Sequence, residues 1–119
     1  MKRIEAIIRP EKVDAVCGVL KEIADGALMI SGLHGIMLSV IEDRSVGNHV
    51  KIMVRGNSYN KDMIKARLEL TVTDDEVHSI VNTIRKAAFT GIVGDGEIFI
   101  HPVNDAMQIR TGAWSERPI

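Results

Sequence analysis

The sequence predicts a single α+β domain in which two similar strand–helix–strand units share one antiparallel sheet. The first observation is an alternating apolar segment followed by helical spacing near the N-terminus. The second is the return of the same pattern 64 positions later. The third is the length of 119 residues, which is enough for one core and leaves little room for a second domain. Two such units make the double-split βαβ (βαββαβ), or ferredoxin-like, arrangement.

The first unit begins at the N-terminus. Residues 3–9 alternate and place Ile4, Ala6 and Ile8 on one face, which is typical of a strand buried on one side. Pro10 suits the first position of a helix, because its missing N–H has no helical partner there. Apolar residues follow at helical spacing to position 23, an Asp-Gly pair ends the helix, and residues 27–33 are expected to form the second strand.

The second unit repeats the first. Residues 67–72 are the predicted strand, and Thr73 with the acidic residues after it predicts a helix N-cap. The helix is expected to run to about Phe89, and residues 97–101 form the fourth strand. The two units match position by position: Ile4 with Leu68, Glu5 with Glu69, Ile8 with Val72, Val13 with Val77, Val16 with Ile80, Cys17 with Val81, and Leu20 with Ile84.

A long insertion, residues 35–64, separates the two units. Segments 36–43 and 49–54 are strand-like and are joined by turn residues, which predicts a projecting hairpin followed by a polar tip at 55–62. Long insertions in compact domains are usually functional. We therefore expect this large loop to contact a partner.

One face of the predicted sheet has a mixed composition. Helices of this arrangement usually cover a single face of an antiparallel sheet. The opposite face receives polar and apolar side chains together: Glu5, Ile7, Glu69, Thr71 and Phe99. Apolar surface of this kind marks an association site, so we expect a homo-oligomer formed through the sheet.

Composition excludes several classes of function. The net charge of −1 argues against a broad basic surface for nucleic acid, and the 3% of aromatic residues leaves few platforms for base stacking. No stretch approaches the length of a membrane span, and the N-terminus lacks an uninterrupted apolar core of a signal peptide. The single cysteine, Cys17, lies among apolar neighbours and is interpreted as a structural thiol rather than a reactive one. We expect a soluble cytoplasmic protein without membrane insertion.

The strongest local signal is the glycine-rich loop at residues 90–97. Its three glycines, Gly91, Gly94 and Gly96, allow the backbone to approach a ligand, and consecutive N–H groups can bind an anion. The alternative is a helix C-cap followed by a turn into the next strand, which also favours glycine. Glu97 follows the loop directly, where a cation would reinforce phosphate binding.

The remaining candidate groups are scattered. Arg110 in segment 108–112 is suited to pairing with a phosphate or to a surface ion pair. Possible metal ligands are His34, His49, His101, Glu42, Asp43 and Met53. No two of these histidines share a recognised metal spacing, so no metal site is assigned. No nucleophile with its base, and no pair of carboxylates, stands out, so an enzyme is not expected.

Three segments together resemble the P-II signal-transduction proteins, also known as nitrogen regulatory proteins. They are the opening segment 2–12 (KRIEAIIRPEK), the loop 90–99 (TGIVGDGEIF) and the ending 109–112 (IRTG). The resemblance implies a single domain over residues 1–119 that forms a non-catalytic homotrimer, with nucleotide sites in the clefts between subunits. It also implies sensing of adenine nucleotide, often with 2-oxoglutarate, and docking of the large loop onto a regulated transporter or enzyme.

The resemblance also implies roles for individual residues. Gly91, Gly94, Asp95 and Gly96, with Thr90 before them, match the nucleotide-contacting loop of the family. Gly35 matches the glycine that opens the large loop, and Arg110 matches the second arginine of a C-terminal pair that begins the tail 106–119. Tyr59 stands where the family carries a modifiable tyrosine; the alternative is a half-exposed tyrosine packed on the loop.

Departures from the family pattern bear on the ligand. Glu97 and Gln108 replace a lysine and the first arginine of the pair, and Met29 replaces a threonine near the nucleotide. Leu38 and Ser39 replace the arginine and glutamine after the loop opening, and that glutamine helps to hold magnesium and 2-oxoglutarate in the family. A hydrogen bond to a charged group contributes about 1.5–3 kcal/mol, so the loss of several cationic contacts predicts weak ATP binding.

The ligand expected from these departures is ADP, AMP, a cyclic nucleotide or, weakly, ATP, with no required cofactor. Response to 2-oxoglutarate by the usual route is not expected. The alternative hypothesis for the function is that the protein is a metal-responsive or metal-binding trimer of similar architecture.

Overall fold

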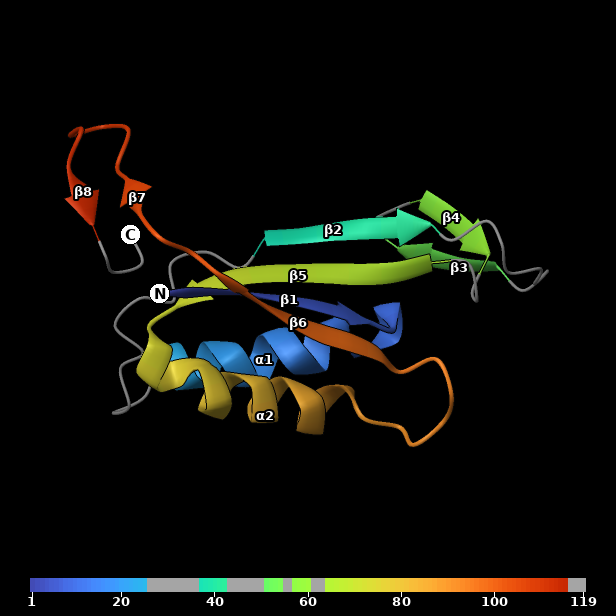
Figure 1. Ribbon diagram of the computed structural model, residues 1–119. Helices are drawn as coiled ribbons and strands as arrows, with labels where there is room; N and C mark the ends of the chain where they lie inside the picture. Colours follow the sequence, from blue (N-terminus) through green and yellow to red (C-terminus); the bar gives the residue numbers. More distant parts are fainter. Residues whose placement is uncertain (26–36, 43–50, 55–56, 61–63, 116–119) are drawn as a thin grey trace.

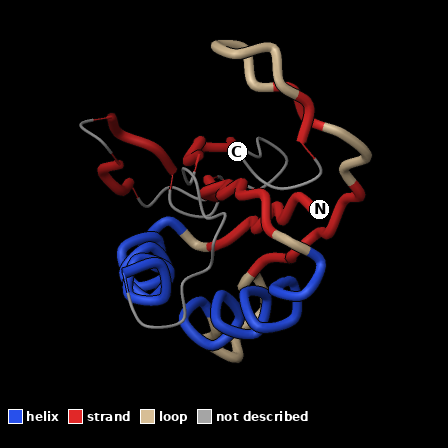
Figure 2. The backbone as a smooth tube through the Cα atoms, turned by 90° about the vertical axis from the view of Figure 1, so that its left-hand side faces the viewer, coloured by secondary structure: helices blue, strands red, loops and turns tan. Residues whose placement is uncertain are grey.

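The computed structural model describes residues 1–25, 37–42, 51–54, 57–60 and 64–115. In these residues a four-stranded antiparallel sheet is covered on one face by two helices, as Figures 1 and 2 show. The strands run in the order β2-β5-β1-β6, and the helices are α1 and α2. Their bounds are Lys2–Ile8 (β1), Val13–Asp25 (α1), Met37–Glu42 (β2), Ile64–Val72 (β5), Val77–Ala88 (α2) and Gly96–Pro102 (β6). The predicted α+β, ferredoxin-like arrangement is confirmed.

Both helices begin with a short 3₁₀ turn. Pro10 opens the first of them, η1 (Pro10–Lys12), as its lack of a backbone N–H favours. The second, η3 (Asp74–Glu76), has Thr73 as its N-cap residue, as predicted, but the Thr73 side chain makes no capping hydrogen bond. The carbonyl of Thr73 instead accepts the Glu76 N–H at 3.1 Å, while Asp74 pairs at 2.7 Å with the amino group of Met1. The N-terminal amino group is therefore paired with the 3₁₀ turn that precedes α2.

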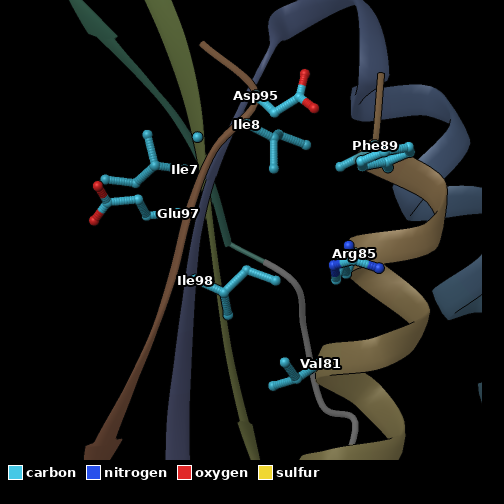
Figure 3. Close-up of a pocket in the computed structure, with 10 residues that line it drawn as sticks. Ile7, Ile8, Val81, Arg85, Phe89, Asp95, Glu97 and Ile98 are labelled. Atoms are coloured by element: carbon cyan, nitrogen blue, oxygen red, sulfur yellow. The ribbon is translucent and has the colours of Figure 1, made fainter. Parts of the chain in front are cut away.

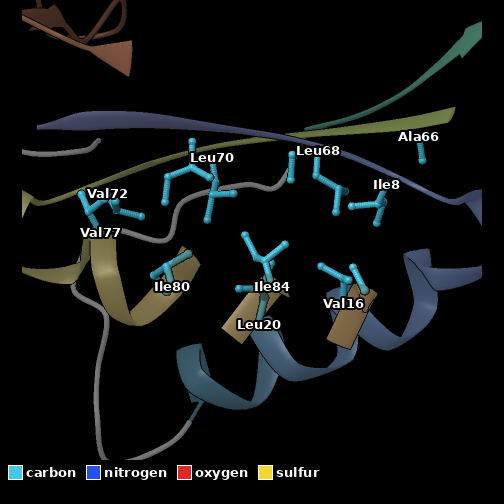
Figure 4. Close-up of a cluster of buried hydrophobic side chains, with 13 residues drawn as sticks. Ile8, Val16, Leu20, Ala66, Leu68, Leu70, Val72, Val77, Ile80 and Ile84 are labelled. Atoms are coloured by element: carbon cyan, nitrogen blue, oxygen red, sulfur yellow. The ribbon is translucent and has the colours of Figure 1, made fainter. Parts of the chain in front are cut away.

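The core lies between the sheet and the helices (Figure 4). Strand β5 alternates strictly between buried and half-buried residues, and β1 buries every second residue from Ile4 onwards. The repeat predicted this symmetry: Val16 and Leu20 of α1, and Ile80 and Ile84 of α2, are all fully buried. Cys17 is partly buried and packs against the same core.

The large insertion differs from its prediction. Segment 36–43 does not pair with 49–54 in the described residues. Instead β2 pairs with β5, and a separate hairpin forms between β3 (Lys51–Val54) and β4 (Asn57–Asn60). The expected polar tip therefore contains a strand, and the register Glu42–Ile64 closes the base of the loop. The predicted strand 27–33 lies outside the described residues.

The face of the sheet opposite the helices carries the mixed side chains that the sequence predicted. The Arg67 Nε atom donates to Ser39 Oγ at 3.0 Å and lies 3.2 Å from Glu69 Oε1. Glu5 lies 3.9 Å from His101 on the neighbouring strand, and the Phe99 side chain is 40% exposed. In a single chain this face therefore leaves both charged and aromatic groups open to association. In the described part of the chain no helix is long and apolar enough to cross a membrane.

Candidate functional site

The glycine-rich loop connects the end of α2 to the start of β6. Gly91, Gly94 and Gly96 adopt positive φ angles of 84°, 105° and 102°, which L side chains rarely adopt. A Cβ atom on Gly96 would lie 1.7 Å from the carbonyl oxygen of Ile7. Glycine is therefore required at position 96 for β6 to approach β1, which agrees with the alternative interpretation of a turn into the next strand.

The side chain of Asp95 organises this loop from within. Its Oδ2 atom accepts the backbone N–H groups of Thr90 and Gly91, each at 2.9 Å. Its Oδ1 atom accepts the Thr90 hydroxyl and, at 3.0 Å, the Nε–H of Arg9. The Thr90 hydroxyl and N–H are the main reasons that the pKa of Asp95 lies well below its usual range. Asp95 thus fixes the loop conformation, and its carboxylate is fully engaged there.

Two cations hold the outer turn of the loop through its carbonyl groups. Arg9, at the end of β1, donates to the carbonyls of Ile92 at 3.3 Å and Val93 at 3.0 Å. Lys65, at the start of β5, donates to the carbonyl of Gly94 at 2.6 Å. Both cations come from strands that are distant in sequence from the loop. The sequence analysis did not assign either of them to the site.

The loop therefore combines free donors with positive charge. In the described residues the backbone N–H groups of Val93 and Gly94 make no hydrogen bond, and Val93 is 99% exposed. A Cβ on Gly94 would lie 3.3 Å from the Arg9 guanidinium and 3.6 Å from Lys65 Nζ. Two cations therefore lie close to Gly94, beside backbone amides that make no hydrogen bond in the described residues.

A cavity of about 330 Å³ lies beside the loop, between α2 and the adjoining ends of β1 and β6 (Figure 3). Its wall on the strand side includes Ile8 and Ile98, and its wall on the helix side includes Val81, Arg85 and Phe89. Figure 3 shows the Glu97 side chain on the other side of β6, away from α2. Glu97 therefore faces the same side of the sheet as Ile7.

Arg110 lies far from the glycine loop within one chain. It is exposed in the turn between β7 (Ala106–Met107) and β8 (Trp114–Ser115), at the opposite end of β6 from the loop (Figure 1). Seven residues of β6 span about 23 Å in an extended strand. The side chain of Gln108 accepts the Thr111 hydroxyl at 2.8 Å and so belongs to the same turn.

The other predicted site residues are only partly placed. Thr90, Gly91, Gly94, Asp95 and Gly96 lie in one loop, and their binding of a nucleotide stays a prediction. Gly35 lies outside the described residues. Tyr59 is in β4, opposite Ile52 in the register. Among the residues that the structure describes, no group of three or more His, Cys, Asp or Glu side chains is arranged to hold a metal ion.

The fold and the loop define a small ferredoxin-like protein with a glycine-rich loop, held by Asp95, Arg9 and Lys65, at one end of its sheet. Residues 1–113 match the family described as Nitrogen regulatory protein P-II, so the chain belongs to the P-II family. It is similar to Nitrogen regulatory protein P-II 2 of Methanothermobacter thermautotrophicus, with 37% identity over 100% of this chain and 97% of that protein.

Two further relatives agree with this assignment. The P-II protein of Cereibacter sphaeroides is 42% identical over 98% of this chain and 97% of its own length. The crystal structure of Arabidopsis thaliana P-II bound to citrate is similar with a TM-score of 0.66 and 31% identity, covering 97% of this chain and 88% of that one. P-II proteins are signalling regulators, and the chain belongs with them by both sequence and fold.

Proposed function

We propose that this protein is a non-catalytic cytoplasmic regulator that works as a single-domain homotrimer and senses an adenine nucleotide in the clefts between its subunits. The proposal rests on the positions of the glycine loop and Arg110, the two proposed parts of the nucleotide site, which lie far apart within one chain. The glycine loop with Arg9 and Lys65 lies at one end of β6, and Arg110 lies at the other. A second copy of the chain is needed to bring an Arg110 to a glycine loop.

The charges near the loop favour a nucleotide with fewer phosphates than ATP. Arg9 and Lys65 supply positive charge, but both already donate to loop carbonyls. Glu97 adds a carboxylate beside the loop, and Gln108 is held in its own turn. Repulsion from Glu97 grows with the charge of the phosphate chain, so ADP, AMP or a cyclic nucleotide is the proposed ligand. The citrate bound to Arabidopsis P-II supports a small anion as a ligand of this kind of protein.

The large loop, residues 35–64, is proposed to dock onto the regulated transporter or enzyme. Its base is fixed by the pairing of β2 with β5, and its β3–β4 hairpin forms a separate unit of two strands. Ser39, at this base, is tied to Arg67 of β5. The sheet end beside the glycine loop is thus connected to the base of the large loop through β5. A ligand that changes the position of this sheet end would therefore also change the position of the loop base. Tyr59, in the hairpin, is the proposed modification site.

Mixed assemblies test the site between subunits. Arg110→Ala and Asp95→Asn each disable one half of the proposed cleft, and each variant alone is expected to lose ADP binding in calorimetry. Trimers assembled from both variants together should recover binding in the clefts that join an intact loop to an intact Arg110. Lys21→Ala, which removes an exposed cation on α1, is the control and should bind like the original protein.

Two results would overturn this proposal. The first is unchanged ADP affinity in Arg110→Ala, which removes that residue from the site. The second is a native mass of one 13.1 kDa chain instead of three, which removes the cleft itself.

A further inference from the structure

The cavity between α2 and β6 has the size and lining of a small-molecule pocket. Its volume of about 330 Å³ falls in the range of ligand sites, which are mostly apolar with a few placed polar groups. Ile8 and Ile98 point into it from the strands, and Val81 and Phe89 point into it from the helix (Figure 3). It lies on the helix side of the sheet, whereas Glu97 and the mixed sheet face lie on the other side.

One side chain supplies unbalanced charge to this pocket. The guanidinium of Arg85 lies over the Phe89 ring, 5.2 Å from its centroid, which holds the cation at the pocket wall. Within the described part of the chain, Arg85 has no acidic partner. Asp95 also lines the pocket, but its carboxylate is neutralised by Arg9 and by the donors of the loop.

The C-terminal end of α2 lies beside this charge. The carbonyl end of α2 carries a partial negative charge, and Arg85 and Lys86 stand in its last turn, where they offset it. Because Arg85 has no acidic partner in the described part of the chain, its guanidinium can still pair with an anionic ligand group, while most of the wall favours an apolar one.

We propose that this pocket binds a small monocarboxylate with an apolar body, separately from the nucleotide cleft. The apolar part would lie between Ile98 and Val81, and the carboxylate would pair with the fork of the Arg85 guanidinium. A polyphosphate does not suit this pocket, because its lining contains one cation, Arg85, together with the carboxylate of Asp95. The site uses neither Arg110 nor the free amides of the glycine loop, so it does not depend on the proposed nucleotide cleft.

Titration with benzoate and with its neutral analogue benzamide tests the charge requirement. In the assembled protein with labelled isoleucine methyl groups, benzoate should shift the signals of Ile8 and Ile98 with saturation. Benzamide should bind at least about tenfold more weakly, because the charge-assisted pair is lost. Arg85→Gln should weaken benzoate by a similar factor, and Lys86→Gln, its neighbour in the same helical turn, should not change it.

A second variant keeps the test independent of charge. Val81→Phe should fill the cavity and abolish benzoate binding, while ADP binding persists. Three outcomes overturn the proposal: equal affinities for benzoate and benzamide, unchanged affinity in Arg85→Gln, and no shift of Ile98 by benzoate. The last of these is also the outcome if a second copy of the chain covers the pocket in the assembly.

Discussion

Replacing Gly96 by alanine should be the most damaging glycine substitution in the described part of the chain. Its φ of 102° costs a residue with a Cβ about 1–3 kcal/mol. The new Cβ would also lie 1.7 Å from the Ile7 oxygen, which belongs to β1 and cannot rotate away. Because β1 is paired on both sides, by β5 and β6, relief requires β6 to move. The total cost is expected to exceed about 3 kcal/mol, by the same range of strain energies with the clash added.

Two other glycines provide matched controls for the same substitution. Gly112 has a φ of 71° with nothing within 4 Å of its Cβ position, so alanine there costs conformational energy alone, about 1 kcal/mol. Gly18 lies in α1 with equally open space, so alanine should stabilise the protein by about 0.5–1 kcal/mol.

Thermal unfolding at a fixed protein concentration measures all three variants, since self-association makes Tm depend on concentration. At about 3–4 °C per kcal/mol, Gly96→Ala should lower Tm by about 10 °C or more, and Gly112→Ala by about 3 °C. Gly18→Ala should raise it by about 2 °C. If Gly96→Ala is no worse than Gly112→Ala, the close approach of β6 to β1 does not constrain the loop.

Three further predictions concern the loop, the chain start and the core. Because the pKa of Asp95 is lowered from 3.8, its contribution is present above that pH and is lost only as the solution becomes more acidic. Hydrogen exchange should therefore show that the Gly91 amide is still protected at about pH 4. Asp95→Asn should remove that protection at every pH. Equal exchange of this amide in both proteins would contradict the prediction. Asp74→Asn should lower Tm slightly at low salt and not in about 1 M NaCl, because the N-terminal pair is exposed and screened; a loss that is independent of salt would refute this. Leu20→Ala and Ile84→Ala should each cost about 3 kcal/mol in urea unfolding, and clearly unequal losses would contradict the equivalence of the two repeat units.

The repeat was sufficient to predict the core because periodicity reports which face of an element is buried. Residues such as Leu20 and Ile84 therefore fell on the buried side of their helices in both units. Strand partners were harder to predict. Segment 36–43 has the correct strand pattern, but its partner β5 is chosen by long-range register, which local alternation does not encode.

The position of the candidate loop was predictable from the sequence, but the distant residues that bind it were not. Its three glycines lie between positions 91 and 96, whereas Arg9 and Lys65 reach the loop across 84 and 29 positions. The signal that could have located them is the shared register, in which Ile8 pairs with both Ala66 and Gly96 and brings three element ends together. The engagement of the Asp95 carboxylate inside the loop was not predictable from local sequence either, because one of its partners is Arg9.

We propose that the charges around the glycine loop favour an adenine nucleotide with fewer phosphates than ATP. The most direct measurement is calorimetry of ADP, AMP, cyclic AMP, cyclic di-AMP and ATP on the assembled protein, with and without magnesium and 2-oxoglutarate. We predict that at least one of the less charged nucleotides binds more tightly than ATP, and that 2-oxoglutarate adds nothing. Tight ATP binding that requires magnesium and is strengthened by 2-oxoglutarate would contradict the account.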